Sequence, residues 1–86
     1  MDTEALKLAL DAADAAARQH SRTSSGVYLE ISSHSDGTVS VMLHKPSYPD
    51  LKDRLIAICR ERCHGEPMVE DTKVYLTIDY TPKSNA

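Results

Sequence analysis

The chain has 86 residues and a net charge of −3 at neutral pH, and it contains neither Trp nor Phe. Its length predicts a single domain with a small aliphatic core, for which self-association is a common source of stability. Acidic and basic residues are interspersed, which disfavours a general polyanion binder, and no apolar run is long enough to cross a membrane. Because the two cysteines come without a secretory signal, we expect a cytoplasmic protein.

The first helix is predicted to run to about His20, after Asp2 or Thr3 as the N-cap. In helical projection it has one apolar stripe and one narrow charged stripe, which consists of Lys7, Asp11, Asp14 and Arg18. Three further apolar residues lie on neither stripe: Leu8, Ala12 and Ala15. We expect them to pack against the sheet and the second helix, and contact with a partner chain is the alternative.

Two strands are predicted next, because apolar and polar residues alternate over residues 27–32 and 39–44. The number of residues in the turn that joins them decides whether the apolar residues of the two strands share one face of the sheet. A three-residue loop ending at Gly37 pairs Leu29 with Leu43, so that both apolar sets face the same side of the sheet. We therefore expect Gly37 to adopt the left-handed conformation that glycine tolerates best.

The second helix is predicted between Ser47, a candidate capping residue followed by an early proline, and Gly65, a candidate C-cap. Residues 73–80 alternate in the cleanest period of two in the chain and predict the last strand. The segments at residues 21–26 and 66–72 lack such a pattern, and we expect them to be connectors.

The predicted fold is a single α+β domain over residues 1–81, in the order α-β-β-α-β, followed by a flexible tail over residues 82–86. Its three strands form an antiparallel sheet of order 2-1-3, and both helices cover one face. The alternative order 1-2-3 is expected to pair the second and third strands in parallel. The covered face is expected to carry Val27, Leu29, Ile31, Val39, Val41, Leu43, Val74, Leu76 and Ile78.

The other face of the predicted sheet is open to solvent and is the best candidate for a binding surface. It is expected to present Tyr28, Glu30, Ser32, Ser40, Met42, His44, Lys73, Tyr75, Thr77 and Asp79. We select as contact residues Tyr28, Glu30, Met42, His44 and Tyr75. The predicted register places Tyr28 opposite His44 and Glu30 opposite Met42. An ordinary solvated sheet face is the alternative interpretation.

A zinc or redox site is the second candidate, formed by Cys59, Cys63 and His64. Two cysteines four residues apart share one face of a helix, but three ligands from one segment leave the fourth unassigned. The helix C-terminus also disfavours a thiolate. We favour two small core residues, and we expect neither a metal nor a cofactor.

A nucleic-acid-binding split-β domain is the third candidate. Basic residues enrich the second helix, namely Lys52, Arg54, Arg60 and Arg62, but acidic residues dilute them. The order of elements resembles that of type II KH and related split-β domains, yet the chain lacks both a GxxG loop and the aromatic pairs of an RRM. Nucleic acid is therefore the less favoured partner.

The histidines His20, His34 and His44 lie on separate predicted elements and form no catalytic constellation, so we do not expect an enzyme. The favoured hypothesis is a small interaction module, which binds through the open sheet face or an edge strand. We expect it to form a homodimer and to bind an as yet unidentified protein, as an adaptor, regulator or inhibitor of bacterial or phage type.

Overall fold

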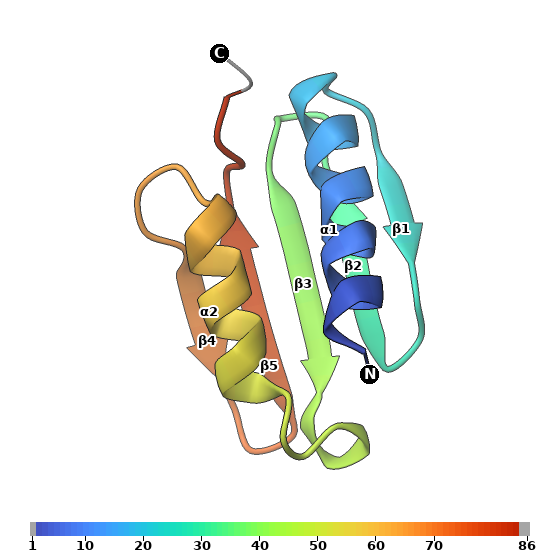
Figure 1. Ribbon diagram of the computed structural model, residues 1–86, viewed down its shortest axis with the longest axis vertical. Helices are drawn as coiled ribbons and strands as arrows, with labels where there is room; N and C mark the ends of the chain where they lie inside the picture. The colour runs from blue at the N-terminus through green and yellow to red at the C-terminus, as the bar shows by residue number, and fades with distance from the viewer. Residues whose placement is uncertain (1, 85–86) are drawn as a thin grey trace.

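Two helices lie side by side over one face of a five-stranded antiparallel sheet (Figure 1). The structure is a computed structural model that describes residues 2–84. The elements are α1 (Thr3–Arg18), β1 (Thr23–Ser25), β2 (Leu29–Ser33), β3 (Val39–His44), a short 3₁₀ helix η1 (Lys45–Ser47), α2 (Lys52–Arg62), β4 (Met68–Asp71) and β5 (Tyr75–Tyr80). The predicted α+β class and antiparallel sheet are confirmed, whereas the prediction of three strands is wrong.

The strands lie in the order β1-β2-β3-β5-β4, so the last strand pairs with β3 and not with β2. The predicted order 2-1-3 is therefore wrong, and the pairing of β3 with β5 is antiparallel rather than parallel. The presence of strand β4 accounts for the position and direction of β5. It runs in the same direction as β3, since each is antiparallel to β5, and α2 crosses from one to the other. The β4–β5 hairpin then places β5 between them.

The two strands that the sequence pattern does not predict, β1 and β4, form the edges of the sheet. Both lie in predicted connectors, at residues 21–26 and 66–72, so the connector prediction is wrong there. Every residue of these strands is exposed, and neither strand shows the alternation of buried and open positions that marks an inner strand. Side-chain hydroxyl groups support β1 instead, and the oxygens of Thr23 and Ser33 lie 2.9 Å apart.

The turn between β2 and β3 confirms the parity argument. Leu29 lies opposite Leu43, and Gly37 has a φ of 89°. The backbone N–H of His34 donates to the carbonyl oxygen of Thr38 at 2.9 Å, which leaves three residues in the loop. The apolar sets of the two strands therefore face the same side, as expected.

Helix α1 begins as predicted, because the carboxylate of Asp2 accepts a hydrogen bond from the backbone N–H of Glu4 at 3.3 Å. Its residues Leu8, Ala12 and Ala15 are exposed, however, and Leu8 is 66% exposed. The expectation that they pack against the sheet and the second helix is wrong. Two acids of the charged stripe, Asp11 and Asp14, face α2 instead and accept hydrogen bonds from Arg62.

Helix α2 is shorter than predicted at both ends and spans Lys52–Arg62. Ser47 does not cap it, because this residue belongs to η1 and its hydroxyl oxygen lies 2.7 Å from Nδ1 of His44. At the other end Cys63 already has an extended backbone, so Gly65 lies beyond the cap position. Both predicted caps are therefore wrong.

The core lies between the helices and the sheet. Its buried members are Leu6, Leu10, Ala13, Ala17, Leu29, Ile31, Val39, Val41, Leu43, Leu51, Leu55, Ile58, Cys59, Cys63, Leu76, Ile78 and Tyr80. Val27 and Val74 are predicted core residues that the structure leaves exposed, by 84% and 40%. Each of them precedes the first residue of its strand, in a loop, so the pleat does not direct it toward the helices. Neither helix of the described residues is long and apolar enough to span a membrane.

The segment after β5 runs past the ends of both helices. The backbone N–H of Lys83 donates to the carbonyl oxygen of Arg62 at 2.9 Å, and Nε of Arg18 donates to the carbonyl oxygen of Lys83 at 2.8 Å. The flexible tail over residues 82–86 stays a prediction, and residues 85–86 lie outside the described part of the chain.

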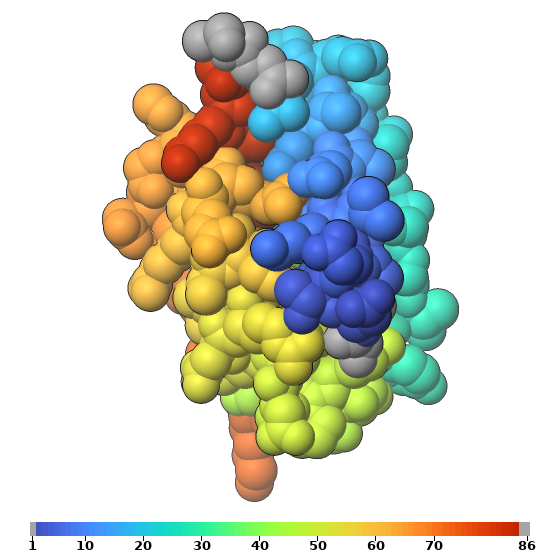
Figure 2. Space-filling view, in the orientation of Figure 1, coloured from blue at the N-terminus to red at the C-terminus, as the bar shows by residue number. Residues whose placement is uncertain are grey.

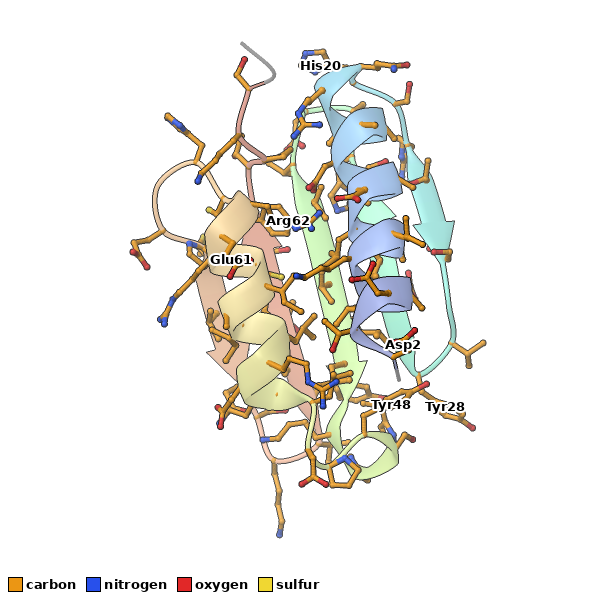
Figure 3. The ribbon with its side chains drawn as sticks, in the orientation of Figure 1. Asp2, His20, Tyr28, Tyr48, Glu61 and Arg62 are labelled. Carbon is orange, nitrogen blue, oxygen red and sulfur yellow. The ribbon has the colours of Figure 1, made fainter. Side chains whose placement is uncertain are left out.

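A buried polar cluster joins α1, α2 and β5. It lies on the helical side of the sheet, and Figure 2 shows the outer surface of that side. Asp14 accepts hydrogen bonds from the hydroxyl of Tyr80 at 2.6 Å and from Arg62 at 2.9 Å, and Arg62 extends between the helices (Figure 3). Burial and the bond to Asp14 raise the pKa of Tyr80, which therefore stays protonated. A second bond, from Arg62 to Asp11 at 2.8 Å, completes the cluster.

Candidate interaction surface

The face of the sheet that the helices leave uncovered is called the open face here. Because residues paired across antiparallel strands share a face, the register assigns to it Ser24, Glu30, Ser32, Ser40, Met42, His44, Met68, Glu70, Tyr75, Thr77 and Asp79. Tyr28 precedes β2 and joins this surface through its ring contact with His44. The five predicted contact residues are thus brought together on one continuous surface.

An aromatic cluster of Tyr28, His44 and Tyr75 occupies one end of the open face. The ring centre of His44 lies 5.6 Å from that of Tyr28 and 5.5 Å from that of Tyr75, in tilted and edge-to-face arrangements. Tyr28 is 57% exposed and Tyr75 is 45% exposed. The cluster therefore orders three rings while it leaves much of their surface available to another molecule.

A row of four residues crosses the middle of the open face. Glu30 on β2 pairs with Met42 on β3, Met42 pairs with Thr77 on β5, and Thr77 pairs with Glu70 on β4. Met42 is 46% exposed and lies two residues before His44 on the same strand face, so it extends the aromatic cluster toward the centre of the sheet. A shallow hollow of about 240 Å³ lies beside it, lined by Glu30, Ser32, His34, Ser40, Met42, Thr77 and Asp79.

The far end of the open face is polar. Ser40 donates its hydroxyl proton to Asp79, and Nε2 of His34 lies 2.9 Å from the same serine oxygen. Since the hydroxyl proton is directed at the carboxylate, Nε2 has to donate rather than accept in this contact. A histidine that donates to a serine cannot take its proton, so the trio lacks the arrangement of an activated nucleophile.

Two residues of the open face, Met68 and Glu70, belong to β4, and the sequence pattern does not predict their place on this face. Their strand is short and fully exposed, so it carries no alternating pattern. The signal that could have revealed it is the turn-forming stretch around Thr72, directly before the alternating residues of β5. The hydroxyl of Thr72 accepts from the backbone N–H of Tyr75 at 2.9 Å and closes that hairpin.

The structure does not bring the residues of the zinc or redox alternative together as a site. Cys59 and Cys63 are buried, whereas His64 is exposed. Burial raises the pKa of the Cys59 thiol to about 12 and also raises that of Cys63, so both sulfurs hold their protons at neutral pH. Across residues 2–84 no group of three His, Cys, Asp or Glu side chains is placed to hold a metal ion.

The basic residues of α2 that favour the nucleic-acid alternative have acidic or polar partners. Lys52 forms an ion pair with Asp71, Nε of Arg60 lies 3.8 Å from a carboxylate oxygen of Glu66, and Arg62 bonds Asp11 and Asp14. Arg54 donates to the hydroxyl of Thr3 at 3.2 Å. The positive charge of this helix is thus distributed over pairs within the chain.

Comparison with known proteins identifies no relative. No protein-family model matches the chain, and neither a curated protein nor a solved structure is significantly similar to it.

Proposed function

We propose that the chain is a small, non-enzymatic protein-interaction module that binds a partner protein through the open face. The observation that carries the proposal is the exposed aromatic cluster, which is continuous with Met42, and Met42 in turn borders a hollow. Tyrosine and methionine are enriched at protein interfaces, where a rigid ring offers a large contact area at a small entropic cost. An adaptor, a regulator or an inhibitor acting in the cytoplasm uses a surface of this kind.

The proposal includes a homodimer formed through an edge strand. Strands β1 and β4 each pair on one side within the described part of the chain, which leaves backbone groups available to a second copy. Met68 and Val69 on β4 are 74% and 41% exposed, so this edge offers apolar area besides its backbone groups. The small aliphatic core favours such an addition.

A photo-crosslinking experiment tests the use of the open face. A photoreactive amino acid replaces Met42 in one variant and Ala57, exposed on α2, in a control variant, and both are irradiated in the producing cells. We expect a defined crosslinked partner from the Met42 position alone, and its loss when Tyr28→Ala and Tyr75→Ala are added. The same products from both positions would contradict the proposal.

Native mass spectrometry tests the homodimer separately. We expect a dimer for the unmodified chain and a monomer for Val69→Arg, which places a charge on the β4 edge. The matched control is Val27→Arg, at an 84% exposed position outside the strands, and it should remain a dimer. A monomeric unmodified chain would remove self-association from the proposal.

A further inference from the structure

The open face carries negative charges that form no ion pair with a cation of the described chain, although Arg22 lines neighbouring hollows with Glu30 and with Asp79. Its ionised side chains are Glu30, Glu70 and Asp79, and the strand residues that the structure assigns to this face include neither Lys nor Arg. None of the three takes part in an ion pair among residues 2–84. The acids that do form ion pairs are Asp11, Asp14, Glu66 and Asp71.

The carboxylates surround the apolar centre of the face. Glu30 and Glu70 end the row that passes through Met42 and Thr77, so three strand spacings, about 14 Å in all, separate their backbones. Asp79 lies farther along β5, and both it and Glu30 border the hollow beside Met42.

Hydrogen bonds hold two of these carboxylates in place. Oε1 of Glu30 accepts from the hydroxyls of Ser24 at 3.0 Å and Ser32 at 3.3 Å, and Asp79 accepts from Ser40. The second oxygen of each carboxylate makes no hydrogen bond with residues 2–84 and is available to a bound molecule. A charge that is already oriented loses less entropy on binding than a freely rotating one.

We infer that the open face binds a positively charged segment of the partner protein, which places Arg or Lys side chains over Glu30 and Glu70 and an apolar side chain in the hollow beside Met42. The inference rests on the proposed function and names the chemistry of its partner. An extended segment advances about 3.4 Å per residue, so basic residues four positions apart match the separation of the glutamates. The apolar residue midway between them faces the same side. The faces of Tyr28 and Tyr75 also attract cations.

The same charges exclude other occupants of this face. A second copy of the chain would bring its own three carboxylates against the first three, so self-association through the open face is repulsive. A nucleic acid would meet them with its phosphates. The homodimer therefore has to use another surface, and the edge strands satisfy that requirement.

Three peptide amides test the inference by NMR titration of the isotope-labelled full chain. The probe is Thr-Arg-Thr-Leu-Thr-Arg-Thr, in which both arginines and the leucine project to one side when the peptide is extended. One control replaces both arginines with Glu, and the other replaces the leucine with Ser. We expect saturable shifts at Glu30, Met42 and Thr77 with the probe, weaker binding of the Ser peptide, and no binding of the Glu peptide.

Charge-neutralising variants identify the sites of contact. Glu30→Gln and Glu70→Gln should each lower the affinity for the probe about two- to fivefold. Raising the salt concentration should reduce the difference in affinity between each variant and the unmodified chain. Glu61→Gln removes the same charge from α2 on the helical side and should leave the affinity unchanged (Figure 3).

Failure of the inference and failure of the proposed function give different results. Equal or tighter binding of the Glu peptide, shifts confined to the helices, or absence of saturable binding by the arginine probe would overturn the inference. If Met42 still crosslinks a partner in those cases, the interaction module stands and its partner segment is not basic. If Met42 gives no specific crosslink, both proposals fall.

Discussion

The two faces of the sheet differ in whether their charged and apolar side chains are buried and paired, although neighbouring residues of the same strands lie on the two faces. On the helical side Leu43 is fully buried and Asp14 is bound by Arg62 and Tyr80. On the open face Met42 is 46% exposed, and Glu30 has hydroxyl partners but no cation. Charges of the helical side are thus used in folding, whereas those of the open face remain available for binding.

The largest expected effect is on the buried cluster. Asp14→Ala leaves the guanidinium of Arg62 and the hydroxyl of Tyr80 without their buried acceptor, and we expect a loss of about 3–5 kcal/mol in the free energy of unfolding. Urea denaturation measures it. Asp11→Ala removes the exposed partner of the same guanidinium and should cost less than about 1 kcal/mol.

If Asp14→Ala does not fold, Tyr80→Phe provides a milder test. It removes one hydrogen bond to the carboxylate and should cost about 1.5–3 kcal/mol. Equal stability of the Asp14→Ala and Asp11→Ala proteins would show that the buried Asp14 contributes no more to the free energy of unfolding than the exposed Asp11.

The second prediction compares adjacent residues of β3. Leu43→Ala creates a cavity in the core and should cost about 2–5 kcal/mol. Met42→Ala removes a side chain that is already 46% exposed on the open face, so it should cost less than about 1 kcal/mol. Thermal and urea unfolding of both variants measure the difference, and similar losses would contradict the distinction between the faces.

The third prediction concerns the turn that assigns residues to the two faces. Gly37 has a φ of 89°, and a β-branched side chain is strained there, so Gly37→Val should cost about 1–3 kcal/mol. Gly37→Asn is the matched control, because asparagine tolerates a left-handed backbone better and should lose less. Equal losses in urea unfolding would show that the backbone conformation of Gly37 does not limit stability.

The smallest effect is a pH dependence at the β4–β5 end. Hydrogen bonds from Lys45 and Lys52 hold the pKa of Asp71 below its ordinary value of 3.8. Because the pKa is lower in the folded protein, the stabilisation is complete above the ordinary pKa and disappears as the pH falls through the lowered one. We expect Asp71→Asn to be less stable than the unmodified chain at pH 7, with the difference shrinking below about pH 4.

Glu70→Gln is the control for this prediction, since it alters the neighbouring acid on the open face, which has no ion-pair partner in the described chain. Its stability should follow that of the unmodified chain at pH 7. Denaturation curves collected from pH 7 to pH 2 test both variants. A constant difference for Asp71→Asn across this range would contradict the role of the two lysines.

The sequence by itself determines the inner strands, both helices and most of the open face. Alternation over residues 39–44 predicts β3 with its observed bounds, and the parity of the turn predicts the pairing of Leu29 with Leu43. These predictions succeed because alternation and turn length are local properties. They also assign Met42 and His44 to one surface before any tertiary contact is known.

The tertiary structure alone decides the strand order, the edge strands and the role of Asp14. In sequence Asp14 is one member of a charged helix stripe, and its partners Arg62 and Tyr80 lie 48 and 66 residues away. Likewise, β1 and β4 have no buried face, so their strand conformation comes from pairing with β2 and β5. The strand order depends on the pairing of β3 with β5, which α2 and β4 separate in the sequence, and a local pattern of side chains does not encode such a pairing.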